Sequence, residues 1–368
     1  AGDARRGPDR TPTQPEHSIS HGRSESARGA GRGRPAVGLR VLDERLCAVG
    51  LEVTANGYAA VVRDNAGAVR YRESDRLPVS MRGGAFADAL SRLVADIAAR
   101  AEQENSEEES SVRVIGAGCA IPGTVNSKEA RLVRSRELSL SDEPLPVRSA
   151  SDKRPFPVVC DNDAHCGAWG ELHARSRTGA HAVGGRSDPD GRVAWELANL
   201  LFVLGRSSVR HLGVGIGLVV DGVVRYGGTH TSGEFYSGKW AGDERSQFSL
   251  SPDALARASR DGSLRAQVFG ELCEGLVPVV SVADPQAVVF GGLFREHFTE
   301  ITAAARSRAS GARIAGLFAP SYLAGNEIAG GAAALFHEQL FRVPRYDRSG
   351  GAALVSWEDV IELLEERV

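Results

Sequence analysis

The stretch Val158–Ser176, VVCDNDAHCGAWGELHARS, joins a short apolar run to a helix-like segment through Asp161, Asn162 and Asp163. Two carboxylates around an amide at the end of a buried strand have three interpretations: a helix cap, a metal site, or a sugar site with a catalytic base. A cap requires only that Asn162 or Asp163 accept a backbone N–H from the helix that begins near Ala164. The rest of the sequence has to decide between them.

The same succession of elements occurs twice along the chain. Short runs rich in Val, Ala and Tyr over residues 46–74, separated by the turn signal Asn56-Gly57 and by Asn65-Ala66-Gly67, predict an antiparallel meander of three strands. A second meander is predicted over residues 198–228, with Asp221-Gly222 as its hairpin turn. Helices and strands then follow each meander, with helices expected at Phe86–Glu104, 254–259, 264–277, Glu327–Phe341 and Trp357–Val368 and strands at 112–123, 156–163 and 284–294. This duplication predicts an α/β fold of two lobes, each a mixed sheet covered by helices, with a ligand cleft between them.

Composition excludes several classes of protein. The 368 residues are 42% hydrophobic and 25% charged, with a net charge of −3, so no global field favours nucleic acid or a membrane. No apolar run approaches the ~18–20 residues of a membrane span. The cysteines are odd in number and scattered, which favours a cytoplasmic protein with buried free thiols over a disulfide scaffold: they are Cys47, Cys119, Cys160, Cys166 and Cys273.

The first 36 residues are rich in Gly, Arg, Ser and Pro and have almost no large apolar side chain. Such a segment cannot bury enough surface to offset its ordering entropy, so we expect a disordered basic tail. Its part Ala27–Pro35 could contact phosphates of nucleic acid, but a linker is the simpler interpretation.

Four motifs, taken in their order along the chain, resemble those of a known protein family. They are GxxxPG at Gly118–Gly123, Asn-Asp-Ala at the start of Asn162–Glu171, the glycine-rich run and Gly-Glu of Gly213–Glu234, and DPxxVxxGG at Asp284–Gly292. Together they resemble ROK proteins (repressors, open reading frames and sugar kinases) over about residues 31–345. The segment 31–41, GRGRPAVGLRV, is similar to the one that joins the DNA-binding head to the sugar domain in ROK regulators.

The resemblance implies a two-lobed, actin-like (ribonuclease H-like) duplicated α/β fold with a central cleft. The expected division is a tail over 1–36, an N-terminal lobe over 37–161 joined by a helix from 327–345, a sugar-binding lobe over 162–326, and a helical tail over 346–368. A homodimer is also what the resemblance implies.

The resemblance also implies the residues that contact a sugar. Asn162 would hydrogen-bond a sugar hydroxyl, while Asp163 would accept one and, in a kinase, act as the general base. Glu234 would accept hydroxyl hydrogen bonds, Gly233 would allow a close backbone approach, and Gly123 would line the pocket. The simpler alternatives are a cap for the Asn-Asp pair, a surface glutamate after a glycine turn, and an ordinary turn at Gly123. Strand alternation is expected to point Asp161 away from its neighbour.

The phosphate-binding loops depart from the kinase pattern. The kinases carry Asp-x-Gly-Gly-Thr near the start, where this chain has Glu52–Asn56 without either glycine, so side chains at Thr54 and Ala55 should crowd the phosphates. The second loop, Gly-Thr-Gly-x-Gly-x-Gly in the kinases, aligns with His211–Gly217 and lacks the threonine. If ATP and Mg²⁺ did bind, the surviving candidates for cofactor contact are Gly213, Gly215, Gly291 and Gly292.

A zinc motif that accompanies the sugar loop in the family is absent. Ser237 stands where the family has histidine, and no Cys-x-Cys follows it. Cys160, His165 and Cys166 are close in sequence, but on a strand and helix they point apart, so we expect no metal and no other cofactor.

The chain keeps the amino acids expected to contact a sugar but departs from the kinase pattern in both phosphate-binding loops. This combination favours one function. The chain is expected to be the sugar-sensing effector domain of a ROK-type transcriptional regulator, concerned with carbohydrate metabolism and contacting nucleic acid only through a DNA-binding head that is not in this chain. Two alternatives stay open: an ATP-dependent sugar or amino-sugar kinase with Asp163 as base, and a headless, non-catalytic sugar-binding protein.

Overall fold

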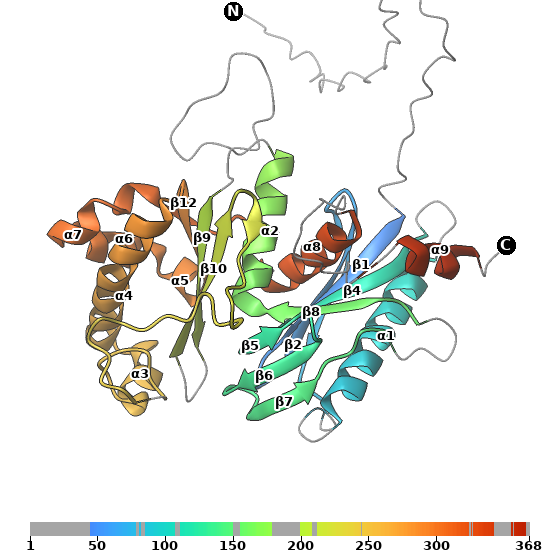
Figure 1. Ribbon diagram of the computed structural model, residues 1–368, viewed down its shortest axis with the longest axis horizontal. Coiled ribbons are helices and arrows are strands. Elements are labelled where there is room, and N and C mark those ends of the chain that lie inside the picture. The colour runs from blue at the N-terminus through green and yellow to red at the C-terminus, as the bar shows by residue number, and fades with distance from the viewer. Residues whose placement is uncertain are drawn as a thin grey trace, which may run out of the picture. The chain divides into compact units, whose positions relative to one another are not determined.

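Two five-stranded mixed sheets with equivalent strand orders form the framework of the protein (Figure 1). The computed structural model describes residues 45–78, 81, 85–106, 111–149, 155–178, 199–207, 212–243, 245–323, 325, 327–341, 355 and 357–365. The expected tail over 1–36, residue His211 and the start of the expected C-terminal tail lie outside these residues.

The first sheet has the order β3-β2-β1-β4-β8. β1, β2 and β3 form the predicted antiparallel meander, and β1, β4 and β8 run parallel. The bounds are β1 Leu46–Val53, β2 Tyr58–Asp64, β3 Val69–Asp75, β4 Arg113–Ile121 and β8 Val158–Asn162. The first of the two predicted meanders is therefore confirmed.

The second sheet repeats this arrangement with the order β11-β10-β9-β12-β13. Its meander is antiparallel, and β9, β12 and β13 run parallel. The bounds are β9 Leu200–Ser207, β10 Leu212–Val220, β11 Val223–Val224, β12 Ala287–Gly292 and β13 Phe318–Pro320. Asp221 and Gly222 form the predicted hairpin turn with positive φ angles of 55° and 72°. The duplicated, two-lobed α/β fold is confirmed.

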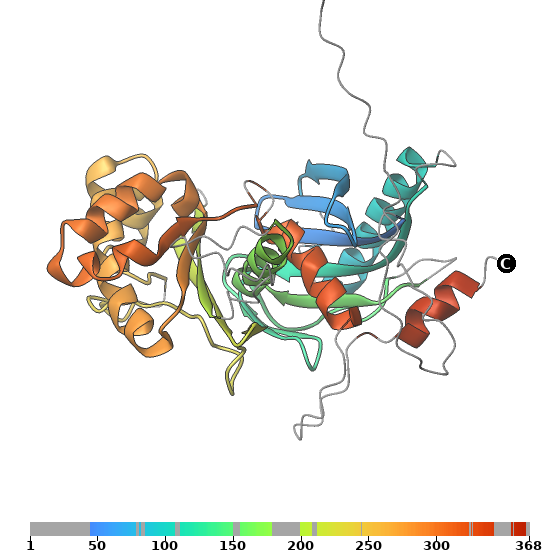
Figure 2. The ribbon, with the colours of Figure 1, turned by 90° about the horizontal axis from the view of Figure 1, so that it is seen from above.

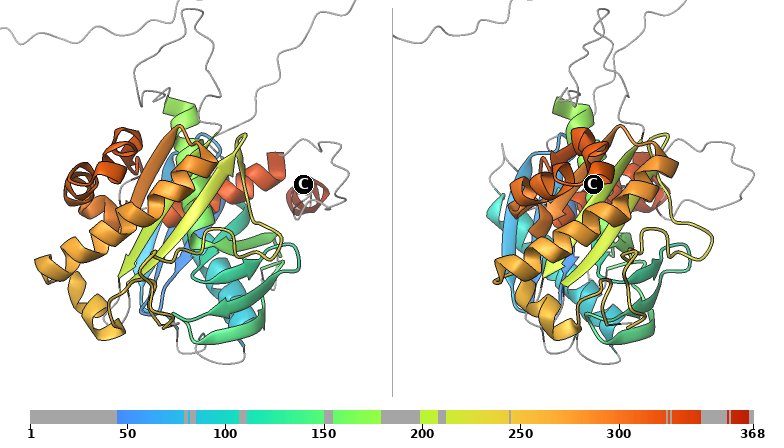
Figure 3. Two further views of the ribbon diagram at one scale, coloured as in Figure 1. Left: turned by 60° about the vertical axis from the view of Figure 1, so that its left-hand side comes forward. Right: turned by 90° about the vertical axis from the view of Figure 1, so that its left-hand side faces the viewer.

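A third sheet, β5-β6-β7, was not predicted. Its antiparallel strands are Thr124–Asn126, Arg131–Ser135 and Leu140–Pro144, directly after the GxxxPG motif. The strands are only three to five residues long and mix polar with apolar side chains, so they do not differ in composition from a loop. Figure 3 shows the chain between β11 and α3 (yellow) running beside this sheet.

Helices α2 and α8 lie between the two five-stranded sheets (Figures 1 and 2). A side chain at Gly50 in β1 would approach the Ala329 carbonyl oxygen of α8 to 1.9 Å, and one at Gly331 in α8 would approach the Cys166 carbonyl oxygen of α2 to the same distance. These glycines allow backbones to pack in direct contact. As a result α2 is fixed against both α8 and the second sheet, and its first residue has a defined position.

The helices are bounded as α1 Phe86–Glu104, α2 Asp163–Thr178, α3 Pro252–Ala258, α4 Gly262–Ala283, α5 Leu293–Glu296, α6 Phe298–Arg306, α7 Ala309–Ala312, α8 Glu327–Phe341 and α9 Trp357–Glu365, with a 3₁₀ turn at Ala315–Leu317. α4 is longer than predicted, because it continues through Pro278 to a left-handed cap at Asp284. Its apolar residues on both sides of the proline are buried against the second sheet, and this packing outweighs the local cost of the proline.

All of these elements belong to one compact unit, Leu42–Val368. Among the described residues, α4 alone is long and apolar enough to cross a membrane by length and composition, a case that the sequence analysis did not identify. Its buried residues include Phe269, Leu272 and Leu276, which belong to the core of the second sheet.

Candidate functional site

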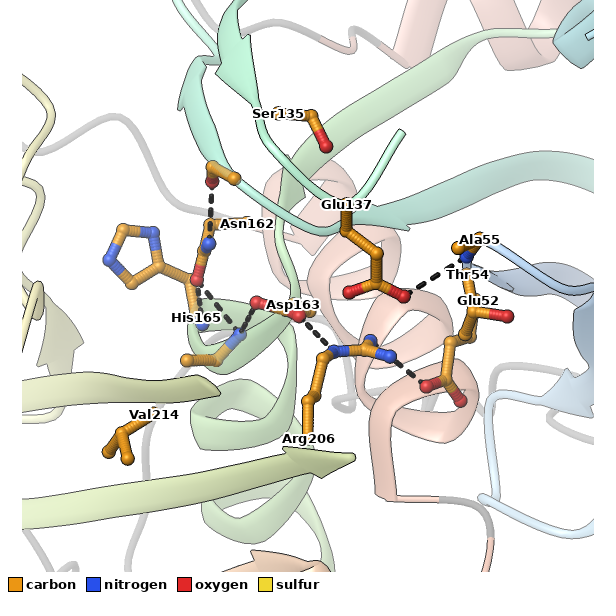
Figure 4. Close-up of polar contacts among 12 residues, drawn as sticks. Glu52, Thr54, Ala55, Ser135, Glu137, Asn162, Asp163, His165, Arg206 and Val214 are labelled. Carbon is orange, nitrogen blue, oxygen red and sulfur yellow. Dashed lines mark hydrogen bonds and ion pairs between the residues drawn. The ribbon is translucent and has the colours of Figure 1, made fainter. Parts of the chain in front are cut away.

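The junction of β8 and α2 places the Asn-Asp pair. The Asn162 Oδ1 atom accepts hydrogen bonds from the backbone N–H groups of Ala164 (2.8 Å) and His165 (3.3 Å), so Asn162 caps α2 (Figure 4). Its side-chain amide donates to the Gly123 carbonyl oxygen at 2.7 Å. The capping interpretation therefore holds for Asn162, and the same side chain fixes the loop of the GxxxPG motif beside Asp163.

Asp161 points into the protein interior, where it is fully buried. Its Oδ1 atom accepts the backbone N–H of Asn162 at 2.7 Å and lies 3.1 Å from Nδ1 of His165. No motif includes this pair, although a carboxylate and an imidazole four residues apart where a helix begins were a usable signal in the sequence.

His165 connects α2 to the loop Thr231–Glu234, called here the Glu234 loop. Its Nε2 atom lies 3.3 Å from the Ser232 carbonyl oxygen. Burial lowers the pKa of His165, but the Asp161 carboxylate and the Ser232 carbonyl together raise it above its ordinary value. Since both ring nitrogens face acceptors, the doubly protonated ring satisfies both contacts, and His165 positions the loop.

Gly233 brings the Glu234 loop into contact with β10. Its φ angle is 93°, its carbonyl oxygen accepts the N–H of Ile216 at 2.9 Å, and a side chain at Gly233 would approach the Ile216 carbonyl oxygen to 1.8 Å. Glu234 then pairs with Gly215 in an antiparallel bridge. The close backbone approach expected of Gly233 is thus present, but toward β10.

The Glu234 side chain is exposed toward the third sheet. Desolvation by its surroundings raises its pKa, while the Arg136 guanidinium and a hydrogen bond with Thr124 of β5 oppose this rise. The neighbouring carboxylate of Asp163 also raises the pKa of Glu234. Asn162, Asp163, Gly123 and the Glu234 loop are therefore brought into one neighbourhood, where an exposed carboxylate can accept hydroxyl hydrogen bonds.

Asp163 is ion-paired to a residue that the sequence analysis did not single out. Its Oδ2 atom accepts a short hydrogen bond from Nε of Arg206 at the end of β9, and its Oδ1 atom accepts the N–H of Ala164 at 2.8 Å (Figure 4). The other side of the Arg206 guanidinium lies 3.0 Å from Oε1 of Glu52, the last but one residue of β1. We call the contact of Glu52, Arg206 and Asp163 the arginine bridge, because it joins the two five-stranded sheets.

The arginine bridge is largely buried, with 16% exposure of the Arg206 side chain. Burial by itself would lower the pKa of Arg206. The carboxylates of Asp163 and Glu52 raise it by more than burial lowers it, so the guanidinium is charged. Burial raises the pKa of Glu52, against the opposing effect of Arg206. The charged guanidinium of Arg206 thus offsets the cost of burying the Glu52 carboxylate, and it also pairs with Asp163.

A cavity of about 220 Å³ lies beside the arginine bridge. Its lining includes Gly205, Arg206 and Gly292 together with three carboxylates, those of Glu52, Glu137 and Glu327. The lining therefore contains more carboxyl groups than guanidinium groups.

Of the four glycines expected to contact a cofactor, Gly292 lines this cavity and the other three do not. A side chain at Gly291 would collide with the Phe202 ring at 2.3 Å, so that glycine serves packing. Leu204–Ser207 of β9 line the cavity, whereas Gly213 and Gly215 of the neighbouring strand β10 do not, although Gly213 pairs directly with Arg206.

The turn between β1 and β2 is closed to an anion by the protein itself. The Ala55 N–H donates to Oε1 of Glu137 at 3.0 Å, and the Thr54 hydroxyl donates to the Gly57 carbonyl oxygen at 3.0 Å. The Thr54 side chain, which was expected to crowd a phosphate, instead directs its hydroxyl back into its own turn. A carboxylate from the loop between β6 and β7 takes the backbone amide instead.

Comparison with known proteins identifies the architecture. No protein-family model matches the sequence, and the comparison with curated proteins gives no match. Among solved structures, the chain is similar to a ROK family glucokinase from Streptomyces griseus in complex with glucose and AMPPNP, with 18% identity, a TM-score of 0.56, and coverage of 78% of this chain and 98% of that one. The chain has the fold of the ROK proteins.

Two further structures with the ROK fold support this result. A ROK family protein from Streptococcus pneumoniae TIGR4 in complex with sucrose has 16% identity, a TM-score of 0.56, and coverage of 80% of this chain and 98% of that one. A ROK hexokinase from Thermus thermophilus has 20% identity, a TM-score of 0.52, and coverage of 78% and 97%. The two-lobed, actin-like fold implied by the motifs is therefore confirmed.

Hydrogen bonds hold the segment that stands in place of the zinc motif of the ROK family. The Ser237 hydroxyl donates to Oε2 of Glu271 at 2.8 Å, and the Ser249 N–H donates to the same oxygen at 2.9 Å. Among the described residues, no three His, Cys, Asp or Glu side chains are placed to hold a metal ion. All five cysteines are buried and unpaired, as predicted. A carboxylate on α4 thus orders this segment through hydroxyl and amide donors.

Proposed function

We propose that the chain binds a small sugar in the cleft between its lobes and does not transfer a phosphoryl group. In this proposal it belongs with the ROK proteins as the effector domain of a transcriptional regulator, acting in the cytoplasm as a homodimer. The sugar ligands named for two proteins of the same fold, glucose and sucrose, support the ligand class.

The arginine bridge is the observation that carries the proposal. A general base takes the hydroxyl proton most readily when no cation of the protein competes for its carboxylate oxygens. Both oxygens of Asp163 already accept hydrogen bonds, from Arg206 and from Ala164, and the amide of Ala55 is already bound by Glu137. Phosphoryl transfer also depends on stabilising negative charge, whereas the adjacent cavity is lined by three carboxylates and one guanidinium.

The contacts expected of a sugar site are compatible with this arrangement. Glu234 is exposed, the Asn162 amide has a second N–H, and Asp163 has lone pairs that accept further hydroxyl donors. A hydroxyl that hydrogen-bonds Asp163 competes with Arg206, and Arg206 also pairs with Glu52 of the other lobe. Sugar binding can therefore bias the relative position of the lobes, as a regulator requires.

The deciding experiment combines calorimetry with a coupled assay for ADP release. Titration with hexoses and N-acetylated hexosamines is expected to give binding that Glu234→Gln weakens at least tenfold. Glu362→Gln, a change at an exposed glutamate of α9, serves as the matched control and should leave affinity unchanged. No sugar-dependent ADP release is expected.

Two outcomes would contradict the proposal. Sugar-dependent ADP release that Asp163→Asn abolishes would establish the kinase alternative. Failure of every sugar to bind would exclude both the regulator and the kinase. If the chain belongs to a regulator, the natural gene product should bind DNA, and the same sugar should change its affinity for DNA in a mobility-shift assay. Sugar binding without this change would favour a non-catalytic sugar-binding protein.

A further inference from the structure

The segment that follows Glu234 alternates in exposure. Phe235 and Ser237 are buried at 3% and 5% exposure, whereas Glu234 and Tyr236 are exposed. In extended backbone, alternate side chains project to the same side and successive ones to opposite sides. The Tyr236 ring is therefore exposed, like the Glu234 carboxylate, two residues further along the backbone.

Tyr236 forms an exposed pair with Trp240. The ring centroids are 4.5 Å apart at an interplanar angle of 44°, and the two residues are 40% and 38% exposed. The Trp240 indole N–H donates to the Asp243 carbonyl oxygen at 3.0 Å, and its backbone N–H donates to the Ser237 carbonyl oxygen at 3.0 Å. The indole is therefore held in place while both rings keep apolar surface in contact with solvent.

Hydrogen bonds and an ion pair to α4 fix the segment that carries these rings. Ser237 is bonded to Glu271, and its N–H donates to the Gln247 carbonyl oxygen at 2.8 Å. Lys239 pairs with Glu274 through an Nζ–Oε2 distance of 2.9 Å. Aromatic side chains fixed in this way bind with little loss of conformational entropy.

We propose that Tyr236 and Trp240 form a second saccharide subsite, in which the rings stack against the apolar C–H face of a sugar ring. The first ring is the one that Glu234 contacts, so this inference rests on the proposed function. It narrows the ligand to a disaccharide or a related glycoside. Two residues span at most about 7 Å of backbone, which suits a second ring joined to the first by one glycosidic oxygen.

The size of the exposed pair favours this occupant over a protein. Two aromatic rings cover one pyranose ring, whereas a stable protein interface buries about 800 Å² on each partner. The position also favours a sugar, because the pair shares a segment with Glu234.

The test is calorimetric titration of the full chain with glucose and with a panel of disaccharides that contain glucose, including maltose, cellobiose and sucrose. We expect at least one disaccharide to bind about tenfold or more tightly than glucose. Trp240→Ala and Tyr236→Ala should each remove about tenfold of that affinity, equivalent to about 1.4 kcal/mol. Glucose affinity should stay the same in both variants, and Trp240→Phe should retain most of the disaccharide affinity.

Trp357→Ala is the matched control, because Trp357 on α9 has a similar exposure of 39% and also contacts an aromatic ring, that of Phe341. It should change neither affinity.

The outcomes distinguish this inference from the proposed function. If glucose binds but no disaccharide binds more tightly, or if Trp240→Ala leaves disaccharide affinity unchanged, the second subsite is wrong and the sugar site stands. If Trp240→Ala changes the oligomeric state in light scattering and not the affinity, the pair is a protein contact. If no sugar binds at all, both are wrong.

Discussion

The two sides of the cleft use their polar groups in opposite ways. On the side of the β1–β2 turn, the Ala55 amide is bound by Glu137, and Arg206 is shared between Glu52 and Asp163. On the side of the Glu234 loop, the Glu234 carboxylate remains exposed. The first side is satisfied by the protein's own charges, while the second presents an acceptor to a ligand.

The difference separates a side whose polar groups are paired within the protein from a side that keeps an exposed acceptor. A carboxylate on a backbone amide and a guanidinium beside the Asn-Asp pair supply internally the contacts that a bound anion and its counter-charge would otherwise make. The same guanidinium still leaves lone pairs on Asp163 for a hydroxyl. Four variants test the contrast.

Arg206→Ala should have the largest effect, because it leaves the carboxylates of Glu52 and Asp163 facing each other without a counter-charge. We expect a loss of about 2–4 kcal/mol in the free energy of unfolding, measured in urea. The figure is set below that of a fully buried pair because Arg206 is 16% exposed. Arg245→Ala, which removes an exposed pair with Asp243, is the control and should give no measurable change. If Arg206→Ala left the free energy of unfolding unchanged, the bridge would not hold the lobes together.

Gly233→Ala tests the ligand side. The substitution forces a side chain into a positive φ of 93° and against the Ile216 carbonyl oxygen, so we expect about 2–3 kcal/mol of destabilisation and at least tenfold weaker sugar binding. Gly222→Ala is the matched control, since its φ is 72° but the surrounding space is open; about 1 kcal/mol and no change in affinity are expected. Equal effects of the two variants would show that the Glu234 loop needs no close approach to β10.

The raised pKa of His165 predicts a pH dependence of stability. A group whose pKa is raised on folding stabilises the folded state fully below its unfolded pKa, about 6.5 for histidine, and this contribution is lost as pH rises through the folded value. We therefore expect the stability gap between the natural chain and His165→Gln to shrink as pH rises above about 6.5. Urea unfolding of both proteins from pH 5.5 to 9 measures this stability gap. A gap independent of pH would indicate that the His165 imidazole is neutral in the folded state.

Glu137→Gln should have the smallest effect. The amide oxygen still accepts the Ala55 N–H but loses the charge, so we expect about 1 kcal/mol of destabilisation or less. Sugar affinity should not change, because Glu137 acts on the opposite side of the cleft from Glu234. A drop in sugar affinity would show that the two sides are coupled.

The sequence was sufficient for the repeated elements, and it offered a helix cap at Asn162 or Asp163 as one alternative, which the structure assigns to Asn162. Turn signals at Asn56-Gly57 and Asp221-Gly222, apolar runs between them, and helical spacing after each meander are local properties, so strands and helices followed from them. The order of four motifs gave the fold. The extension of α4 past Pro278 was missed, because packing against the second sheet outweighs a local breaker.

The chemistry on the phosphate side depended on tertiary structure. Arg206 and Glu137 belong to no motif, and 43 residues separate Arg206 from Asp163 while 82 separate Ala55 from Glu137. Only the pairing of β9 with β10, the packing of α2 between the sheets, and the short third sheet bring these charges together. Local sequence therefore determined which elements form and which glycines are missing, and the fold decided which charges replace them, because ion pairs act through space between residues that no periodicity relates.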